Sequence, residues 1–448
     1  MIFPTLALWS SPDPKDALGR IDRALDDRNH RLSAGISVSS RFDQVSGALV
    51  VAQGNGRYLR IRHVVESSQP IPKAIREGCL ELVSGQSQGC GQLSQVLADL
   101  AEPQANLVEQ LKCAAGKYVD RVLAVAVCDP GIRSTDFDGR ESYVSMCDAT
   151  RLAELSGVSV IDAFPDRDLA AGGSGNCLES LPYWVLFADR DARVASQSRA
   201  VVSVEGRGSG YILPASDGLD SEVPAIQSFE TIGLSFLDEL VRRCLPASQK
   251  LSGLDRLYAD GRYVDELRER WEQRISQISN SISATENSQK HNLENRITEG
   301  LVDVSQSYLA EGDGSFSNVI RTGVRMVVDQ ILVGLKVSKT ESPNQIFVSC
   351  APQYEASLIN QLSQLLESTT IVPTRRTGID RAELSPTVAA ILGLFHIDQM
   401  PANVPWITGA QCQRILGRLT PGRPSSWRQL LRVMADYHPA PMKLKDAV

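Results

Sequence analysis

The sequence is poor in the residues that build metal centres and disulfide frameworks. Its 448 residues include only five histidines, at positions 30, 63, 291, 396 and 438, and no two of them have the spacing of metal ligands. The nine cysteines form no CxxC pair, and their number is odd. We therefore expect reduced thiols in a cytosolic, cytoplasmic protein, with neither a disulfide framework nor a histidine-based metal site.

Long apolar runs and basic blocks are also missing. The chain has no stretch of about 18 apolar residues, the length that a membrane span requires. The opening segment MIFPTLALWSSPDP has a short apolar run without a basic flank, so it matches a secretory signal peptide poorly. The net charge is -7, the pI is about 5.5, and no cluster of Lys and Arg stands out. We expect neither a nucleic-acid partner nor a membrane partner.

What is present is an ordinary globular composition, with 42% apolar and 22% charged residues, arranged as alternating strand and helix patterns. Residues 36–52 and 199–215 share a layout, in which an apolar strand, a turn and a second strand follow one another. Residues 120–129 and 158–164 are short apolar runs typical of buried parallel strands. Two related units with helices between them predict a two-lobed α/β fold with a ligand cleft between the lobes.

The same patterns divide the chain into four segments. We expect an N-terminal extension over residues 1–34, a first lobe over 35–198 and a second lobe over 199–424. The second lobe carries a polar helical insert at about 263–310, whose apolar residues recur at the spacing of one helix face. Residues 425–448 are expected to form a C-terminal helix that returns to the first lobe.

A carboxylate stands shortly before a glycine-rich loop. Asp168 follows a predicted buried strand and precedes the loop Gly172-Gly173-Ser174-Gly175. From the residues alone, two interpretations are open. The carboxylate caps the following turn or helix, or it acts as a general base beside a loop whose glycines let the backbone approach a ligand closely.

Two long segments carry a resemblance. VSVIDAFPDRDLAAGGSGNCLE (158–179) is similar to the pattern DFRxxDxAxGGxGAPL, and MPANVPWITGAQCQRILGRLTPG (400–422) is similar to PxNLPxVTGA…LG…P. Both patterns belong to the anhydro-N-acetylmuramic acid kinases, and weaker likeness spans most of the chain. The resemblance implies the actin-like, ribonuclease H-like fold of sugar kinases. It also implies a reaction in which ATP and water open the 1,6-anhydro ring of the amino sugar and O6 is phosphorylated, during peptidoglycan recycling in bacteria.

The resemblance also assigns roles to individual residues. It places the catalytic general base at Asp168 and a Mg²⁺ ligand at Asp43. The implied sugar-binding residues are Asp148, Arg167, Gly172, Gly173 and Gly175. The implied ATP-binding residues are Ser39, Ser40, Arg41, Asp43, Gly206, Gly208, Glu230, Thr231, Cys350 and Ala351. Because the family is dimeric, the resemblance implies a homodimer.

The phosphate-binding segments depart from the family's pattern. The family's SGTSLDGVD, NIGGIAN, DTGPGN and GGGAxN read SSRFDQVSG (39–47), SVEGRGS (203–209), ETIGLS (230–235) and CAPQYE (350–355). Most of the glycines whose backbone N–H groups would cradle phosphate are gone. Glu205 adds negative charge where a phosphate would approach, and Pro352 removes an N–H and fixes φ.

The sugar-binding segments are also altered, and three hypotheses follow. The family's SHGQT aligns with VCDPG (127–131), which has no histidine, whereas Asp148 of the next segment is retained. The chain is an active kinase that uses ATP and Mg²⁺, or a pseudo-kinase that binds a sugar or a protein partner and needs no cofactor. The third hypothesis is a hydrolase that keeps water activation by Asp168 and dispenses with ATP. We favour a family member with impaired or lost phosphoryl transfer.

Overall fold

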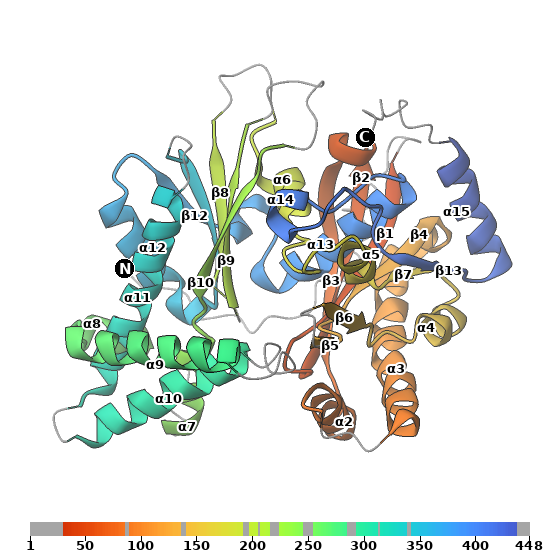
Figure 1. The fold of residues 1–448 in the computed structure, drawn as a ribbon. Coiled ribbons are helices and arrows are strands. Elements are labelled where there is room, and N and C mark those ends of the chain that lie inside the picture. Colours follow the sequence, from red (N-terminus) through yellow and green to blue (C-terminus); the bar gives the residue numbers. More distant parts are fainter. Residues whose placement is uncertain are drawn as a thin grey trace, which may run out of the picture.

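A computed structural model of the chain has two lobes, each built on its own β-sheet (Figure 1). The structure describes these residues: 30–85, 89–135, 140–190, 197–204, 207–215, 224–244, 254–284, 293–311, 314–337 and 342–436. The expected α/β fold is confirmed.

The first lobe is organised around a mixed sheet. Its strands, in spatial order, are β13 (Arg418–Thr420), β7 (Val160–Asp162), β4 (Val122–Cys128), β1 (Arg31–Val38), β2 (Gln44–Gln53) and β3 (Arg60–Pro70). β1 is antiparallel to β2 and parallel to β4, β2 is antiparallel to β3, and β7 is parallel to β4. β13 adds an antiparallel strand at the β7 edge. The separate hairpin consists of β5 (Ile132–Thr135) and β6 (Glu141–Val144).

The second sheet repeats this plan. Its strands, in spatial order, are β10 (Gln227–Ile232), β9 (Arg207–Leu213), β8 (Arg199–Ser203), β11 (Gln345–Ser349) and β12 (Thr370–Pro373). β8, β9 and β10 are antiparallel neighbours, whereas β8, β11 and β12 run parallel. In both sheets the first three strands in sequence order form the antiparallel part and the next two extend the parallel part. The two predicted strand-turn-strand units are therefore the starts of two equivalent sheets.

Helices cover both faces of the first sheet. The helices of this lobe are α2 (Lys73–Val83), α3 (Cys90–Ala115), α4 (Ala149–Ser156), α5 (Phe164–Ala170), α6 (Ser180–Phe187), α13 (Arg381–Ile397), α14 (Pro405–Thr408) and α15 (Pro424–Asp436). α3 packs on β2 and β3, and α13 packs on β1, β2 and β4. Gly35 permits this close packing, because a Cβ there would lie 1.9 Å from the carbonyl oxygen of Pro386 in α13.

The second lobe carries a helical subdomain. Its helices are α7 (Ser235–Cys244), α8 (Leu254–Asp260), α9 (Asp265–Ala284), α10 (Leu293–Ala310), α11 (Phe316–Val337) and α12 (Pro352–Leu365). α9 and α10 form the predicted insert and pack against each other (Figure 1). Trp271 of α9 is fully buried, and its indole N–H donates to the Ser305 hydroxyl of α10 at 3.2 Å. The apolar face of the insert is therefore core, as its spacing indicates.

The lobes share an apolar core and several hydrogen bonds. One buried cluster contains Val50 of β2 together with Val201 of β8, and α6 and α13 contribute to it. The Trp406 indole of α14 donates to the Ile226 carbonyl at 2.8 Å, and the Trp184 indole of α6 donates to the Pro214 carbonyl at 3.0 Å. These contacts set the relative positions of the walls of the cleft.

The element boundaries differ from the segment boundaries that the sequence suggests, although the domain division itself stays a prediction. β1 begins at Arg31, inside the expected extension, and Arg31 pairs with Asp398. The chain returns to the first sheet well before residue 425, because α13 packs on that sheet and β13 joins it. Residues 1–29 and 437–448 lie outside the described residues.

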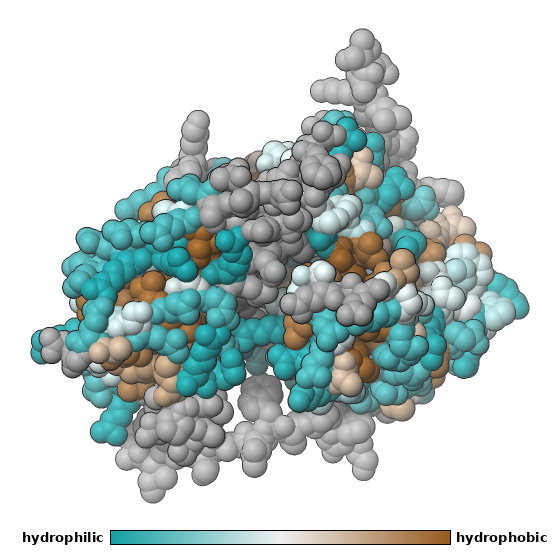
Figure 2. Space-filling model, turned by 60° about the horizontal axis from the view of Figure 1, so that its bottom comes forward, coloured by the Kyte–Doolittle hydropathy of each residue, from teal (hydrophilic) through white to brown (hydrophobic). Residues whose placement is uncertain are grey.

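Figure 2 shows a largely hydrophilic surface on both lobes, with apolar side chains gathered in small separate patches. Within the part of the chain that the structure describes, no helix combines the length and the apolar character needed to span a membrane.

Candidate functional site

The two segments that carry the family resemblance lie side by side at Asp168. This residue belongs to α5 and is fully buried. Its Oδ1 accepts the Asn403 side-chain N–H and the Thr408 hydroxyl, both at 2.8 Å, and its Oδ2 accepts the Gly175 N–H at 2.9 Å. The Ser174 N–H donates to the Thr408 carbonyl at 2.8 Å. One carboxylate therefore fastens the glycine-rich loop to a segment more than 200 residues away.

The loop wraps around this carboxylate so closely that a side chain could not fit between them. A Cβ at Gly173 would lie 2.2 Å from Asp168 Oδ2. Asp168 does not line the cavity between the two lobes, which is called the main cavity below, whereas Gly175 of the loop does. The geometry therefore gives Asp168 a clear structural task, and its role as general base stays a prediction.

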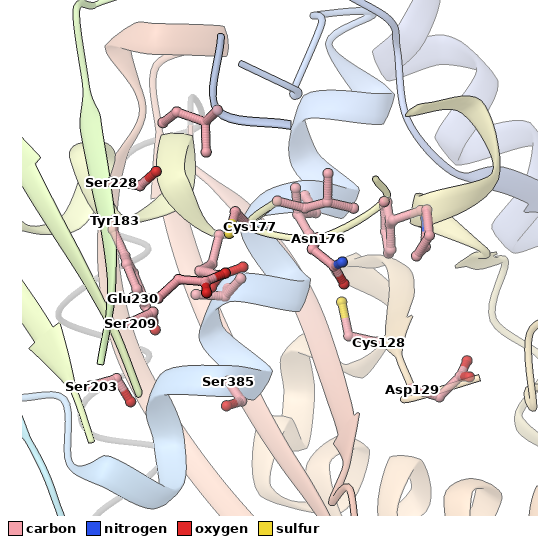
Figure 3. Close-up of a pocket in the computed structure, with 18 of the residues that line it drawn as sticks. Cys128, Asp129, Asn176, Cys177, Tyr183, Ser203, Ser209, Ser228, Glu230 and Ser385 are labelled. Atoms are coloured by element: carbon pink, nitrogen blue, oxygen red, sulfur yellow. The ribbon is translucent and has the colours of Figure 1, made fainter. Parts of the chain in front are cut away.

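The main cavity, with a volume of about 700 Å³, lies between the lobes. Its walls come from the end of β4 and the segment between α5 and α6 on one side, from β8, β9 and β10 on the other, and from α13. Figure 3 shows Asp129, Cys128 and Asn176 on one side of this space, and Ser203, Ser209, Ser228 and Glu230 on the other. The lining is mixed, with polar groups from both lobes facing a common volume, which is the usual character of a small-molecule site.

Asp129 is an acidic residue of the cavity lining. It follows β4 directly, and burial raises the pKa of its carboxyl group above the ordinary value, although three donors oppose this effect. The donors are the Tyr143 hydroxyl, the Ser145 hydroxyl and the Met146 N–H, each at 2.9 Å. A carboxyl group with a raised pKa at the end of a parallel strand is suited to proton transfer and to binding sugar hydroxyls.

Negative charge predominates in the cavity lining. Among the residues that the structure describes, three carboxyl groups line it, those of Asp129, Glu179 and Glu230, against one guanidinium, that of Arg133. Arg133 donates to the backbone carbonyls of Ser174 (3.1 Å) and Gly175 (2.8 Å), so part of its donor capacity holds the loop. Glu179 accepts the hydroxyl of Tyr211 at 2.7 Å, which joins the two lobes at the cavity wall.

The first predicted phosphate turn is closed by its own side chains. Between β1 and β2, the Ser39 hydroxyl donates to Asp43 Oδ1 at 2.5 Å and accepts the backbone N–H groups of Asp43 (3.1 Å) and Gln44 (3.2 Å). Ser40 and Arg41 are exposed at the tip of the turn. No residue of this turn lines the main cavity, so Asp43 as a Mg²⁺ ligand stays a prediction.

The predicted adenosine loop leads into a helix whose first side chains are also paired within the protein. Pro352 occupies the first position of α12, where its missing N–H costs nothing to the helix. The side chains of Gln353 and Tyr354 both donate to Asp238 Oδ1 at 3.0 Å. Burial raises the pKa of Asp238. Around Asp238, polar side chains therefore bond to one another.

The remaining predicted residues divide by location. Asp148 caps α4 by accepting the Arg151 N–H at 2.9 Å, and Gly206 lies outside the described residues. The predicted residues that line the main cavity are Gly175, Gly208 and Glu230. Those that line a second, open cavity of about 860 Å³ beside the β5–β6 hairpin are Gly172 and Gly173. Those that line neither are Ser39, Ser40, Arg41, Asp43, Asp148, Arg167, Asp168, Thr231, Cys350 and Ala351.

Sequence reasoning missed Asp129, Arg133 and Glu179. Asp129 had a signal, because it directly follows a fully apolar run that predicts a central parallel strand, and ligands bind at the carboxyl ends of such strands. Arg133 and Glu179 had no such signal. They reach the cavity through the short hairpin β5–β6 and the start of α6, whose places in space depend on the tertiary fold.

Apart from the added strand β13, the two sheets share one strand order, and a cavity lies between them. These features define the class of this protein, which is a two-lobed α/β protein of the actin-like ATPase fold, to which sugar kinases belong. A family model described as "Anhydro-N-acetylmuramic acid kinase" matches residues 33–206 and 303–422, which is more than half of the chain. The chain therefore belongs to the anhydro-N-acetylmuramic acid kinase family.

Curated relatives carry the same description. The protein from Synechococcus sp. (strain WH7803) is 24% identical over 392 residues, which cover 86% of this chain and 97% of the relative. The protein from Variovorax paradoxus (strain S110) is 30% identical over 205 residues, which cover 44% of this chain and 51% of the relative. The full-length match therefore has low identity, as expected for a divergent member.

Solved structures with weaker likeness include a ROK family glucokinase from Streptomyces griseus in complex with glucose and AMPPNP. It is 12% identical, with a TM-score of 0.34 and coverage of 81% of this chain and 98% of that chain. Component A of the (R)-2-hydroxyglutaryl-CoA dehydratase of Acidaminococcus fermentans is 10% identical, with a TM-score of 0.38 and coverage of 81% and 99%.

Proposed function

We propose that this protein binds an amino sugar of the anhydromuramic acid type in the cavity between the lobes, and that its ATP-dependent phosphoryl transfer is impaired or lost. The observation that carries this proposal is the charge of the cavity lining, to which the described residues contribute three carboxyl groups and one guanidinium. Sugar hydroxyls donate readily to carboxylates, and the Arg133 guanidinium can pair with the single carboxylate of such a sugar, whereas the several negative charges of a triphosphate are repelled.

Glu230 matters most for this argument. It lies on β10 at the segment where the family's glycine-rich loop reads DTGPGN, and it faces the same cavity as Asp129. A triphosphate entering here meets carboxyl groups from both lobes. Mg²⁺ offsets such repulsion only where its ligands converge on the phosphates. The polar groups of the first turn support the same proposal, because the Ser39 hydroxyl bonds within its own turn.

Calorimetric titration of the full chain tests the proposal directly. We expect binding of anhydro-N-acetylmuramic acid in the micromolar to submillimolar range, and binding of Mg²⁺ with a non-hydrolysable ATP analogue that is weaker than about 1 mM, equivalent to about 4 kcal/mol. N-acetylglucosamine serves as a neutral comparison that lacks the carboxylate. Failure to bind the acidic sugar overturns the proposal.

A second function, active kinase, is favoured by one specific observation. Asp129 offers a carboxyl group with a raised pKa inside the cavity, where proton transfer in the ring-opening step would occur. In that case ATP and Mg²⁺ are the cofactors. Micromolar nucleotide binding in the same titration, followed by appearance of the 6-phosphorylated sugar, establishes this alternative and excludes the impaired kinase.

The resemblance further leads us to propose a homodimer in the cytoplasm. Light scattering of the purified full chain tests the assembly, with a mass near twice 48.8 kDa expected. A mass near 48.8 kDa at micromolar concentration contradicts it.

A further inference from the structure

Three metal-ligating side chains converge outside the main cavity. They are His63 and Glu66 of β3 and Glu383 in the first turn of α13, and their ligand atoms all lie within 4.8 Å of one another. His63 Nδ1 is 3.3 Å from Glu383 Oε2. The side chains of His63 and Glu383 are 6% and 10% exposed, so the cluster lies largely beneath the surface.

A β-bulge brings the first two residues together. In a regular strand, residues three positions apart point to opposite faces, so His63 and Glu66 would diverge. Along β2 and β3, however, Leu49 pairs with Val65 and the next residue, Val50, pairs with His63. Val64 is therefore an extra residue that reverses the alternation, and such bulges re-aim side chains.

The helix cap orients the third residue. Glu383 occupies the third position of α13, and its Oε2 accepts the backbone N–H of Asp380 at 2.9 Å in a capping box. This bond turns the carboxylate towards β3. Two glutamates and one histidine then share a small volume. With the histidine neutral, as a metal ligand must be, the trio carries a charge of about -2, which a divalent cation would neutralise.

We propose that His63, Glu66 and Glu383 form a binding site for a divalent cation, with zinc as the preferred ion. Imidazole nitrogen together with carboxylate oxygen is a ligand set that suits zinc, with water in the fourth position. Two ligands at about 2.1 Å from a tetrahedral ion lie about 3.4 Å apart, which agrees with the spacing of His63 and Glu383. The expectation of no such site rested on spacing between histidines, and a site with one histidine from a strand and a glutamate from a distant helix escapes that criterion.

The ion would fasten α13 to the edge strand of the first sheet. α13 follows the segment that returns from the second lobe, and its residues Ser385 and Val388 line the main cavity. Metal binding at Glu383 therefore stabilises one wall of that cavity without contributing a ligand to it. This role is independent of the proposed sugar and nucleotide binding.

The experiment is a zinc titration of full-length protein after treatment with a chelator. We expect one zinc ion per chain and a rise in the thermal midpoint, with much weaker binding of Mg²⁺, which prefers six oxygen ligands. His63→Ala and Glu66→Gln should each lower the affinity by about 100-fold or more, given that loss of an outer-shell partner alone costs about 10–100-fold. Glu383→Gln preserves the capping box and removes the charge, so it tests the ligand in a folded helix.

Glu77→Gln on α2 is the matched control, because Glu77 is an exposed carboxylate whose loss should leave zinc binding unchanged. Cobalt substitution separates the site from the nine cysteines, since cobalt bound by thiolate absorbs strongly in the near ultraviolet and cobalt bound by nitrogen and oxygen does not. Zinc affinity that is equal in the parent protein, His63→Ala and Glu66→Gln overturns the proposal. A thiolate spectrum that persists in all variants overturns it as well.

Discussion

Two polar regions of the molecule use similar residues in different ways. Beside the glycine-rich loop, Asp129 and Glu230 face a common cavity of about 700 Å³. A carboxylate has about four acceptor sites, so Asp129 can accept from a ligand in addition to its three donors in the protein. In and beside the predicted nucleotide-binding segments, the Ser39 hydroxyl bonds to Asp43, and Tyr354 bonds to Asp238. Neither pair lines the cavity, and the members of each pair bond to one another.

This difference shows that a region rich in polar residues is not necessarily able to bind a ligand. The Ser39 and Tyr354 hydroxyls each have one donor hydrogen, which must leave its partner in the protein before it can bind a ligand, and a buried group left without a partner costs about 1–3 kcal/mol. A residue that matches the family pattern, such as Asp43, can therefore serve to stabilise its own turn and need not bind a ligand. Residues that face the cavity are better guides to the function.

The largest expected effect comes from Asp168, which holds both motif segments together. Asp168→Asn replaces one carboxylate oxygen by an amide NH₂ group. The donors of Gly175, Asn403 and Thr408 then compete for the one oxygen that remains. We expect the free energy of unfolding to fall by about 3 kcal/mol, because hydrogen bonds to a buried charged group contribute about 1.5–3 kcal/mol each. Urea denaturation of the parent and the variant measures this difference in the free energy of unfolding.

The neighbouring acid supplies the control for that prediction. Asp166→Asn alters a partly exposed residue of the same helix and should change stability by no more than about 0.5 kcal/mol. If Asp168→Asn retains full stability and abolishes turnover or sugar binding, the residue acts in the chemistry, as the resemblance implies, and its structural role is secondary.

The next effect is a loss of sugar affinity on substitution of Asp129 in the main cavity. Asp129→Asn keeps an acceptor for the Met146 N–H, and the hydroxyls of Tyr143 and Ser145 can rotate, so the fold should survive. Loss of one charge-assisted bond should weaken binding of the amino sugar by about 10-fold or more. Calorimetry measures the affinity, and Glu77→Gln, at an exposed residue of α2 that lines neither cavity, is the control. Equal affinities for the parent and Asp129→Asn place the sugar elsewhere.

Asp129 also predicts a pH dependence of stability. Burial raises its folded-state pKa above the ordinary value of 3.8, so the folded state binds the proton more tightly than the unfolded state. The contribution of Asp129 is therefore most favourable below 3.8 and is lost as the pH rises through the folded-state pKa. The stability of the parent relative to Asp129→Asn should fall over this window in a series of urea denaturations. A constant difference contradicts the raised pKa.

Much of the fold was accessible from the sequence, because its signals are local. The apolar run at 120–129 predicts β4, and the helical spacing of 263–310 predicts α9 and α10. The repeated strand-turn-strand layout indicates two equivalent lobes. The order of strands within each sheet, and the return of α13 to the first lobe, depend on long-range packing that periodicity does not encode.

The site was only partly accessible for the same reason. The two family motifs were recognisable, and the structure brings them together at Asp168 through Asn403 and Thr408. Motif position could not show which way a carboxylate points. Asp168 is enclosed by donors, whereas Asp129, in a segment that had lost the family's histidine, faces the cavity.

A smaller effect is expected beside the predicted adenosine loop. Tyr354→Phe removes one donor to Asp238 and leaves the Gln353 donor in place, so unfolding should become easier by about 1 kcal/mol. Binding of the amino sugar should not change, because Tyr354 does not line the cavity. The control is Tyr58→Phe, at a residue that is 55% exposed. A loss of sugar affinity in Tyr354→Phe would show that the region around Asp238 is coupled to the cavity.

The smallest effect should come from Ser39→Ala, and it is the sharpest test of the comparison. Removing the hydroxyl breaks a bond within an exposed turn, so stability should fall by about 0.5 kcal/mol and both sugar and nucleotide binding should stay unchanged. In a working phosphate turn the same change removes a ligand contact and weakens nucleotide binding. Ser46→Ala on β2 controls for loss of a hydroxyl. A selective drop in nucleotide affinity for Ser39→Ala would mean that the turn opens to receive phosphate. The predicted nucleotide-binding segments would then bind nucleotide.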